Sequence, residues 1–169
     1  MDRIHKSYQD KIMTAQQAAR MIKSGMTLGM SGFTLVGYPK AIPQALAELG
    51  HAKNLTIATG ASVGDNMDGV MARAKLVSHR FPYMSNGDMR KQVNAGEMGY
   101  ADMHLSHIPT FVNQRIGYHL NIAVIEAAAV TECGLIPAVS GCWSDTQVRM
   151  ADKVILEVNQ AIPLSVEGM

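Results

Sequence analysis

Short apolar segments alternate along this sequence with segments of helical spacing, and this alternation limits the folds open to the chain. The segments predicted as strands cover residues 26–30, 55–58, 75–78, 102–105, 122–127 and 154–158. Short apolar strands that are separated by helices form parallel sheets covered on both sides. We therefore predict an α/β fold that is doubly wound, with a mostly parallel sheet and helices on both faces.

The predicted helices carry recognisable start and stop signals. The clearest one begins with the capping-box pair Thr14 and Gln17 and closes at Gly25, and the next ends at Gly50. The helical stretches cover residues 15–22, 42–49, 88–95 and 109–115. Strand, glycine-rich loop and helix thus follow one another in the first third of the chain.

Two further segments complete the prediction of one α/β domain over residues 1–169. Residues 129–140 predict a hairpin, because Glu132, Cys133 and Gly134 separate two β-prone stretches. No linker rich in proline, glycine or serine divides the chain. Residues 165–169 predict no closing helix, so we expect the chain to be part of something longer.

Charged residues make up only 17% of the chain, well below the usual quarter. Few side chains are then available to cover the surface, so we expect apolar surface that faces another domain or another copy, as in a homodimer or other homo-oligomer. The net charge is +1 and the basic residues form no run, so no nucleic-acid partner is expected.

No apolar run approaches the roughly 18 residues that a membrane span needs, so no membrane partner is expected. The N-terminal residues are polar and do not resemble a signal peptide, which predicts a cytoplasmic location. Cys133 and Cys142 lack the spacing of a metal site or a disulfide framework. We interpret both as packing residues.

A glycine-rich loop at residues 29–39 is the best candidate site, because ligands of doubly wound sheets bind beyond the carboxyl ends of the strands. Glycines let the backbone approach a ligand closely, and the start of the following helix favours a carboxylate or an oxyanion. The order of glycines fits neither the dinucleotide fingerprint nor the phosphate-binding P-loop. The same glycines would also suit a simple tight turn.

The loop resembles the first signature of the class I coenzyme A transferases, a G-G-F-x-x-x-G-x-P loop after a short apolar strand. Its fuller form, Ser31-Gly32-Phe33-Thr34 followed by Gly37-Tyr38-Pro39, is similar to the acetyl-CoA hydrolase/transferase family, which includes succinyl-CoA:acetate and propionyl-CoA:succinate CoA-transferases. Further segments agree, at residues 59–62, 80–83, 90–91, 102–106, 123–127 and 153–159. The departures are Ser31, where many CoA transferases have glycine, and residues 140–145, which replace an S-V-G-N stretch.

The resemblance implies a two-domain protein in which this chain is the N-terminal half. The catalytic glutamate of the family lies in the C-terminal domain, where it forms an acyl anhydride and then a glutamyl-CoA thioester. No catalytic residue is therefore expected in this chain, which alone would be inactive. The coenzyme A thioester is a substrate, with a short carboxylate as its partner, and no permanently bound cofactor is implied. The alternative is a non-catalytic binding or assembly module that retains the fold.

With the resemblance included, we predict substrate contacts in two loops. The candidates are Ser31, Gly32, Phe33, Thr34, Gly37, Tyr38, Gly60 and Ser62. The hydroxyl groups would hydrogen-bond a carboxylate, and Phe33 and Tyr38 would form an apolar wall around a short acyl chain. In the competing interpretation, the hydroxyl groups only form turns with their own backbone.

Other polar residues invite functional interpretations that we reject. Glu126 is a carboxylate among apolar residues, but it lies in the half of the family that carries no nucleophile, so we predict a structural role for it and equally for Glu132 and Glu157. The three histidines His104, His107 and His119 lack the spacing of a zinc site, and no metal is expected.

Overall fold

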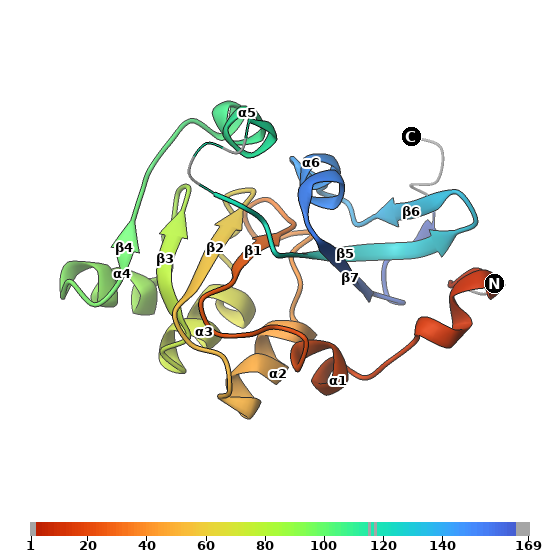
Figure 1. Cartoon of the computed structure of the whole chain (residues 1–169), viewed down its shortest axis with the longest axis horizontal. Coiled ribbons are helices and arrows are strands. Elements are labelled where there is room, and N and C mark those ends of the chain that lie inside the picture. Colours follow the sequence, from red (N-terminus) through yellow and green to blue (C-terminus); the bar gives the residue numbers. More distant parts are fainter. Residues whose placement is uncertain (1–2, 115, 117, 165–169) are drawn as a thin grey trace.

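The computed structural model describes residues 3–114, 116 and 118–164, and its centre is a seven-stranded sheet. The strands follow the order β4-β3-β2-β1-β5-β6, and β7 pairs with β5 (Figure 1). They are β1 (Thr27–Met30), β2 (Leu55–Thr59), β3 (Val77–Phe81), β4 (Gly99–Tyr100), β5 (Ile122–Thr131), β6 (Gly134–Pro137) and β7 (Lys153–Val158). Every pairing between strands is parallel except that of β5 with β6.

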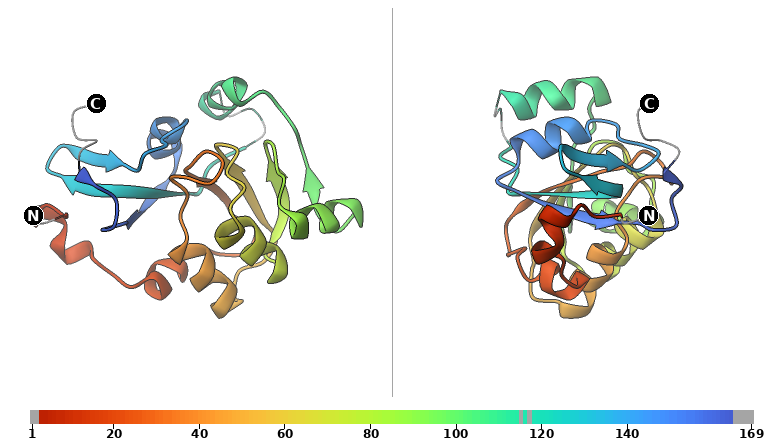
Figure 2. Two further views of the ribbon diagram at one scale, coloured as in Figure 1. Left: turned by 180° about the vertical axis from the view of Figure 1, so that it is seen from behind. Right: turned by 90° about the vertical axis from the view of Figure 1, so that its right-hand side faces the viewer.

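Helices cover both faces of the sheet, as predicted. They are η1 (Lys6–Lys11), α1 (Ala15–Ala19), α2 (Ala41–Leu49), η2 (Asp65–Gly69), α3 (Val70–Arg73), α4 (Gly87–Asn94), η3 (Leu105–His107), α5 (Ile108–Asn113) and α6 (Ser144–Met150). Figure 1 shows α1, α2 and α3 below the sheet and α5 and α6 above it, and Figure 2 shows the same two layers from behind and from the side. No helix among the described residues is both long and apolar enough to cross a membrane.

Each face of the sheet has its own hydrophobic core. Below the sheet, Leu28 and Ile57 belong to a cluster that includes buried residues of α1, α2, α3 and α4. Above it, Ala58 and Phe81 belong to a smaller cluster with the buried residues of α5 and with Trp143. Successive side chains of a strand point to opposite faces, so strands that are apolar throughout can supply both clusters.

Several local predictions are confirmed. Thr14 and Gln17 form the capping box at the start of α1, with hydrogen bonds of 2.8 and 3.2 Å. Helix α2 ends at Gly50, which has a φ of +59° and donates its N–H to Leu46. The hairpin is formed by β6 and the far half of β5.

The strand predicted at residues 102–105 is wrong. The strand in this region is the two-residue β4, and Leu105 begins a short 3₁₀-helix. Asp102 and His104 are exposed, whereas Met103 and Leu105 pack partly against the upper cluster, so a loop at the sheet surface produces the alternation of a strand. Helix α6 was not predicted. The predicted helix end at 115 and the prediction for 165–169 lie outside the described residues.

A buried ion pair joins the second strand-to-helix connection to β3. Arg80 donates from Nε and Nη2 to the two carboxylate oxygens of Asp68, at 3.1 and 3.0 Å, and neither side chain has any exposed surface. The same guanidinium donates to the carbonyl oxygens of Ser62, Phe81 and Pro82 at 2.6 to 2.9 Å. Burial raises the pKa of the Asp68 carboxyl, and the contact with Arg80 opposes this rise.

We predict that Arg80→Met lowers the free energy of unfolding by about 3–5 kcal/mol, because it leaves the Asp68 carboxylate buried without its partner. Urea unfolding followed by circular dichroism measures the effect. Arg73→Met is the matched control, since Arg73 contacts Asp65 and Asp88 at the surface and its loss should hardly move the midpoint. Equal shifts for the two variants would contradict the assignment.

Candidate functional site

Two glycine-rich loops meet at the carboxyl edge of the sheet, one after β1 and one after β2. Thr34 in the first loop donates its N–H to the carbonyl oxygen of Ala61 at 3.1 Å, and its own carbonyl accepts from Val63 at 2.9 Å. This short parallel bridge joins the loops directly to each other. Their backbones therefore form one unit, as expected where parallel strands end side by side.

The tip of the first loop is a tight turn that exposes apolar side chains. Phe33 and Val36 exchange backbone hydrogen bonds of 3.0 and 3.2 Å, and Thr34 adopts a φ of +52°. The exposed fractions are 44% for Phe33, 66% for Leu35 and 47% for Val36. Three exposed apolar side chains within four residues make the tip a candidate contact surface.

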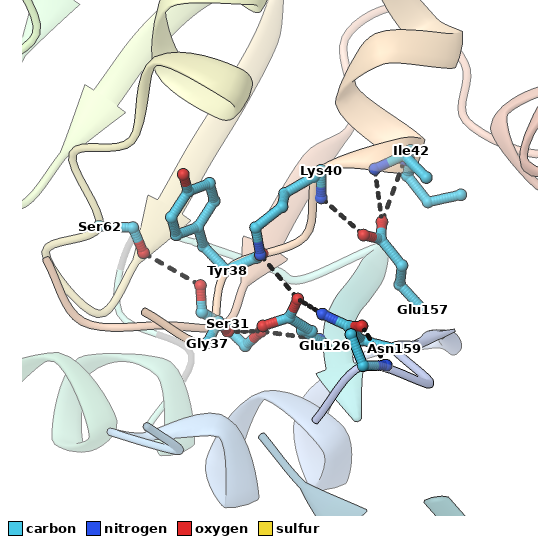
Figure 3. A network of polar contacts seen from close by, with 11 residues as sticks. Ser31, Gly37, Tyr38, Lys40, Ile42, Ser62, Glu126, Glu157 and Asn159 are labelled. Atoms are coloured by element: carbon cyan, nitrogen blue, oxygen red, sulfur yellow. Dashed lines mark hydrogen bonds and ion pairs between the residues drawn. The ribbon is translucent and has the colours of Figure 1, made fainter. Parts of the chain in front are cut away.

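The Ser31 hydroxyl is used within the protein. Its Oγ donates to the carbonyl oxygen of Gly37 at 2.7 Å and accepts the N–H of Glu126 at 2.9 Å (Figure 3). The hydroxyl of Ser62 donates to the carbonyl oxygen of Ser31 at 3.0 Å. Both serines are buried, so their hydroxyl groups tie the loops to each other and to β5 in this structure.

The glycines of the loops are required by close packing of the loops themselves. Gly32 has a φ of +101°, and a Cβ there would lie 2.7 Å from the backbone nitrogen of Tyr38. A Cβ on Gly37 would lie 2.6 Å from the carbonyl oxygen of Ser140, and one on Gly60 would lie 2.3 Å from that of Gly32. No side chain fits at these positions without moving backbone.

Several backbone donors of these loops have no acceptor among the described residues. Gly32, Gly37, Gly60 and Ala61 are buried, yet within this part of the chain their backbone N–H groups donate to no oxygen. Buried N–H groups are nearly always paired, so an unpaired one beside a candidate site is available to a ligand oxygen.

Tyr38 is buried beneath the loops and does not reach the cavity described below. Its ring fills the space beside Gly64, where a Cβ would lie 2.1 Å from ring carbon Cζ. Lys40 lies over the other side, with Nζ 4.3 Å from the ring centroid. The ring therefore supports the loop from below.

Two glutamates fix the start of α2, next to the first loop. Glu126 is almost fully buried and accepts from Lys40 Nζ at 2.7 Å and from Asn159 at 3.0 Å. Glu157 accepts the backbone N–H groups of Lys40, Ala41 and Ile42 at 2.7 to 3.1 Å (Figure 3). These contacts agree with the structural role predicted for both, although Glu126 forms an ion pair rather than a loop cap.

A cavity of about 630 Å³ opens beside the joined loops. Of the predicted contact residues, only Phe33 and Thr34 line it. The other lining residues are Ala61, Pro82, Tyr83, Asp102, Met103, His104 and Leu105. The wall at residues 102–105 was not predicted from the sequence, because this stretch was assigned to a strand. The polar side chains of Asp102 and His104 could have indicated a binding surface there.

The three histidines considered for a metal site lie in two separate places. The rings of His104 and His107 are 5.3 Å apart, whereas His119 contacts Asp152 instead. No group of three side chains able to hold a metal ion occurs among the residues the structure describes.

The packing role predicted for the cysteines is not confirmed, because both are exposed; Cys133 lies in the turn between β5 and β6. Cys142 lies against Gly60, where a Cβ would be 2.9 Å from Sγ. Its partial burial raises the pKa of the thiol, which disfavours the reactive thiolate.

Comparison with known proteins identifies relatives of this arrangement. Residues 1–169 match the model of the acetyl-CoA hydrolase/transferase N-terminal domain. Succinyl-CoA:acetate CoA-transferase of Clostridium kluyveri is 46% identical over 166 residues, which are 95% of this chain and 31% of that protein. Propanoyl-CoA:succinate CoA transferase of Escherichia coli is 36% identical over 87% of this chain and 32% of that protein.

Acetyl-CoA hydrolase of Schizosaccharomyces pombe is also 36% identical, over 87% of this chain and 30% of that protein. The chain thus spans about a third of the length of these curated relatives.

Solved structures share the fold at low identity. Glutaconate coenzyme A-transferase from Acidaminococcus fermentans has a TM-score of 0.66 at 16% identity, covering 92% of this chain and 68% of that chain. RipA from Yersinia pestis has a TM-score of 0.70 at 19% identity, covering 92% and 38%. The loop signature, the parallel sheet and the family match agree: the chain belongs to the acetyl-CoA hydrolase/transferase family and corresponds to its N-terminal domain.

Proposed function

We propose that the chain is the N-terminal domain of an enzyme that transfers coenzyme A between short carboxylates, or hydrolyses the acyl-CoA thioester. The observation that carries this proposal is the pair of glycine loops joined at the carboxyl edge of the sheet beside a cavity of about 630 Å³. The relatives, which are CoA-transferases and acetyl-CoA hydrolases, support it.

In the proposed reaction, a glutamate outside this chain attacks the thioester carbonyl, and the thiolate of coenzyme A leaves. The thiolate then attacks the resulting anhydride at the glutamyl carbonyl, which releases the carboxylate and forms a glutamyl-CoA thioester. In transfer, a second carboxylate attacks the glutamyl thioester and the thiolate of coenzyme A then attacks the new anhydride at its acyl carbonyl, which frees the glutamate. In hydrolysis, water attacks the thioester carbonyl instead, and free coenzyme A leaves. Coenzyme A is thus a substrate, and the proposal includes no resident cofactor.

The predicted contact residues take unequal parts in this proposal. We propose that the Gly32 N–H donates to a carboxylate or a developing oxyanion, which its lack of an acceptor among the described residues supports, and that Phe33 and Thr34 contact a ligand in the cavity that they line. Ser31, Gly37, Tyr38, Gly60 and Ser62 hold the loops in shape, so we propose for them an indirect role in binding.

A non-catalytic assembly module is the second candidate, favoured by the exposed apolar tip of the first loop. A cytoplasmic location and self-association remain predictions. Both functions require a surface that another domain or another copy covers, so contact alone does not separate them.

Acetate should shift the backbone amide resonance of Gly32 in a saturable way, because this N–H has no acceptor in the described part of the chain. The measurement is a ¹⁵N–¹H titration of the chain with sodium acetate, with sodium chloride as the salt control. Gly50 is the internal control, since its N–H already donates to Leu46 at 2.9 Å. An unmoved Gly32 resonance would remove the proposed oxyanion donor.

The chain alone should show no exchange of coenzyme A between acetyl-CoA and succinate or propionate, because binding by a loop cannot replace a covalent nucleophile. Product formation is followed by chromatography against a protein-free blank. Turnover above the blank would show that the nucleophile lies within these residues.

The chain should self-associate through the exposed tip, and Leu35→Asp should reduce the association, because it places a charge among Phe33, Leu35 and Val36. Sedimentation velocity over a range of concentrations measures this, with Ile12→Asp as the control at an exposed apolar residue elsewhere. A wild-type monomer at every concentration would contradict the prediction.

A further inference from the structure

The cavity of about 630 Å³ has a second wall, opposite the glycine loops, whose side chains have no part in the proposed carboxylate site. Volumes of about 300–1,000 Å³ are typical of pockets that hold ligands of drug size. A short carboxylate at the glycine loops would fill only a small part of this space. The wall formed by Pro82, Tyr83 and residues 102–105 therefore faces some larger part of the ligand.

The described charges of this wall do not favour the ionic parts of an acyl-CoA. No lysine or arginine among the described residues lines the cavity, whereas phosphate groups are usually bound by these side chains. Asp102 lines it instead, is exposed, and makes no ion pair or hydrogen bond with any residue the structure describes. An unpaired carboxylate repels both the phosphates of the nucleotide and the carboxylate end of a dicarboxylic acyl group.

The remaining groups fit a neutral chain that carries both amide and apolar parts. Tyr83 is 53% exposed and presents a ring with a hydroxyl group, and Met103 and Leu105 add apolar surface. Asp102 can accept an amide N–H, while Thr34 and His104 can donate to an amide carbonyl. In an acyl-CoA, the pantetheine arm has this composition, with amide groups, a hydroxyl and methyl groups between the thioester and the nucleotide.

We propose that the wall formed by Pro82, Tyr83, Asp102, Met103, His104 and Leu105 binds the pantetheine arm of the thioester, with Asp102 accepting an amide N–H. This inference rests on the proposed function, because it places the thioester carbonyl at the glycine loops and leads the arm away along the wall. The nucleotide then lies beyond the cavity.

The test is a ¹⁵N–¹H titration of the whole chain with pantetheine, which has neither a nucleotide nor an acyl group. We expect saturable shifts at Tyr83 and at residues 102–105. Adenosine 3′,5′-bisphosphate, the nucleotide end, should leave these resonances unmoved. Equal shifts with the nucleotide, or shifts with pantetheine that avoid this wall, would overturn the proposal.

Substitutions at Asp102 separate hydrogen bonding from charge. Asp102→Asn keeps an acceptor and should retain pantetheine affinity within about twofold, whereas Asp102→Leu should weaken it about fivefold through the lost hydrogen bond. Glu132→Leu is the matched control, an exposed carboxylate in the turn between β5 and β6, and it should change nothing. Equal weakening by both Asp102 variants would overturn the acceptor role.

A second variant and a second ligand keep the outcomes distinct. Tyr83→Ala removes an exposed ring, so the fold should persist while pantetheine affinity falls several-fold. Unchanged affinity in this variant would count against the wall as the binding site. The acetate titration tests Gly32 separately. Pantetheine could therefore leave the wall unshifted while acetate still shifts Gly32, which would overturn only the wall. The opposite result would overturn only the glycine-loop donor.

Discussion

The guanidinium of Arg80 is the contact on which the carboxyl edge of this sheet depends. Its donors reach Asp68 in the connection after β2, the carbonyl of Ser62 in the second glycine loop, and the turn that follows β3. A buried charge is tolerated only when it is paired and its hydrogen bonds are filled. These three segments must therefore hold their relative positions. If they moved apart, the buried guanidinium would lose its partners and would destabilise the fold.

The first glycine loop is held by a separate set of contacts. Glu126 contributes its backbone N–H to Ser31 and its carboxylate to Lys40, while Glu157 fixes the beginning of α2. The loop is thus attached to β5 and β7 on one side, and the Thr34 bridge joins it to the second loop on the other. Because two independent anchors meet at this bridge, neither loop can shift without deforming the other.

Sequence patterns predicted the elements whose signals are local. The capping box of α1, the Gly50 end of α2 and the turn of the β5–β6 hairpin each depend on residues a few positions apart. The partners of Ser31 and Lys40 in β5 lie 95 and 86 positions away, and no local pattern reports them. The strand predicted at 102–105 failed for a related reason, because a loop lying on a core can alternate as a strand does.

The contacts of Ser31 also bear on whether this loop tolerates a different residue at position 31. A glycine at position 31 could neither donate to the carbonyl oxygen of Gly37 nor accept the N–H of Glu126. Lys40 Nζ contacts both Glu126 and the carbonyl oxygen of Tyr38. These contacts attach the end of the loop to β5 without using the Ser31 hydroxyl. The loop therefore keeps one of its two attachments to Glu126 of β5 when residue 31 carries no hydroxyl.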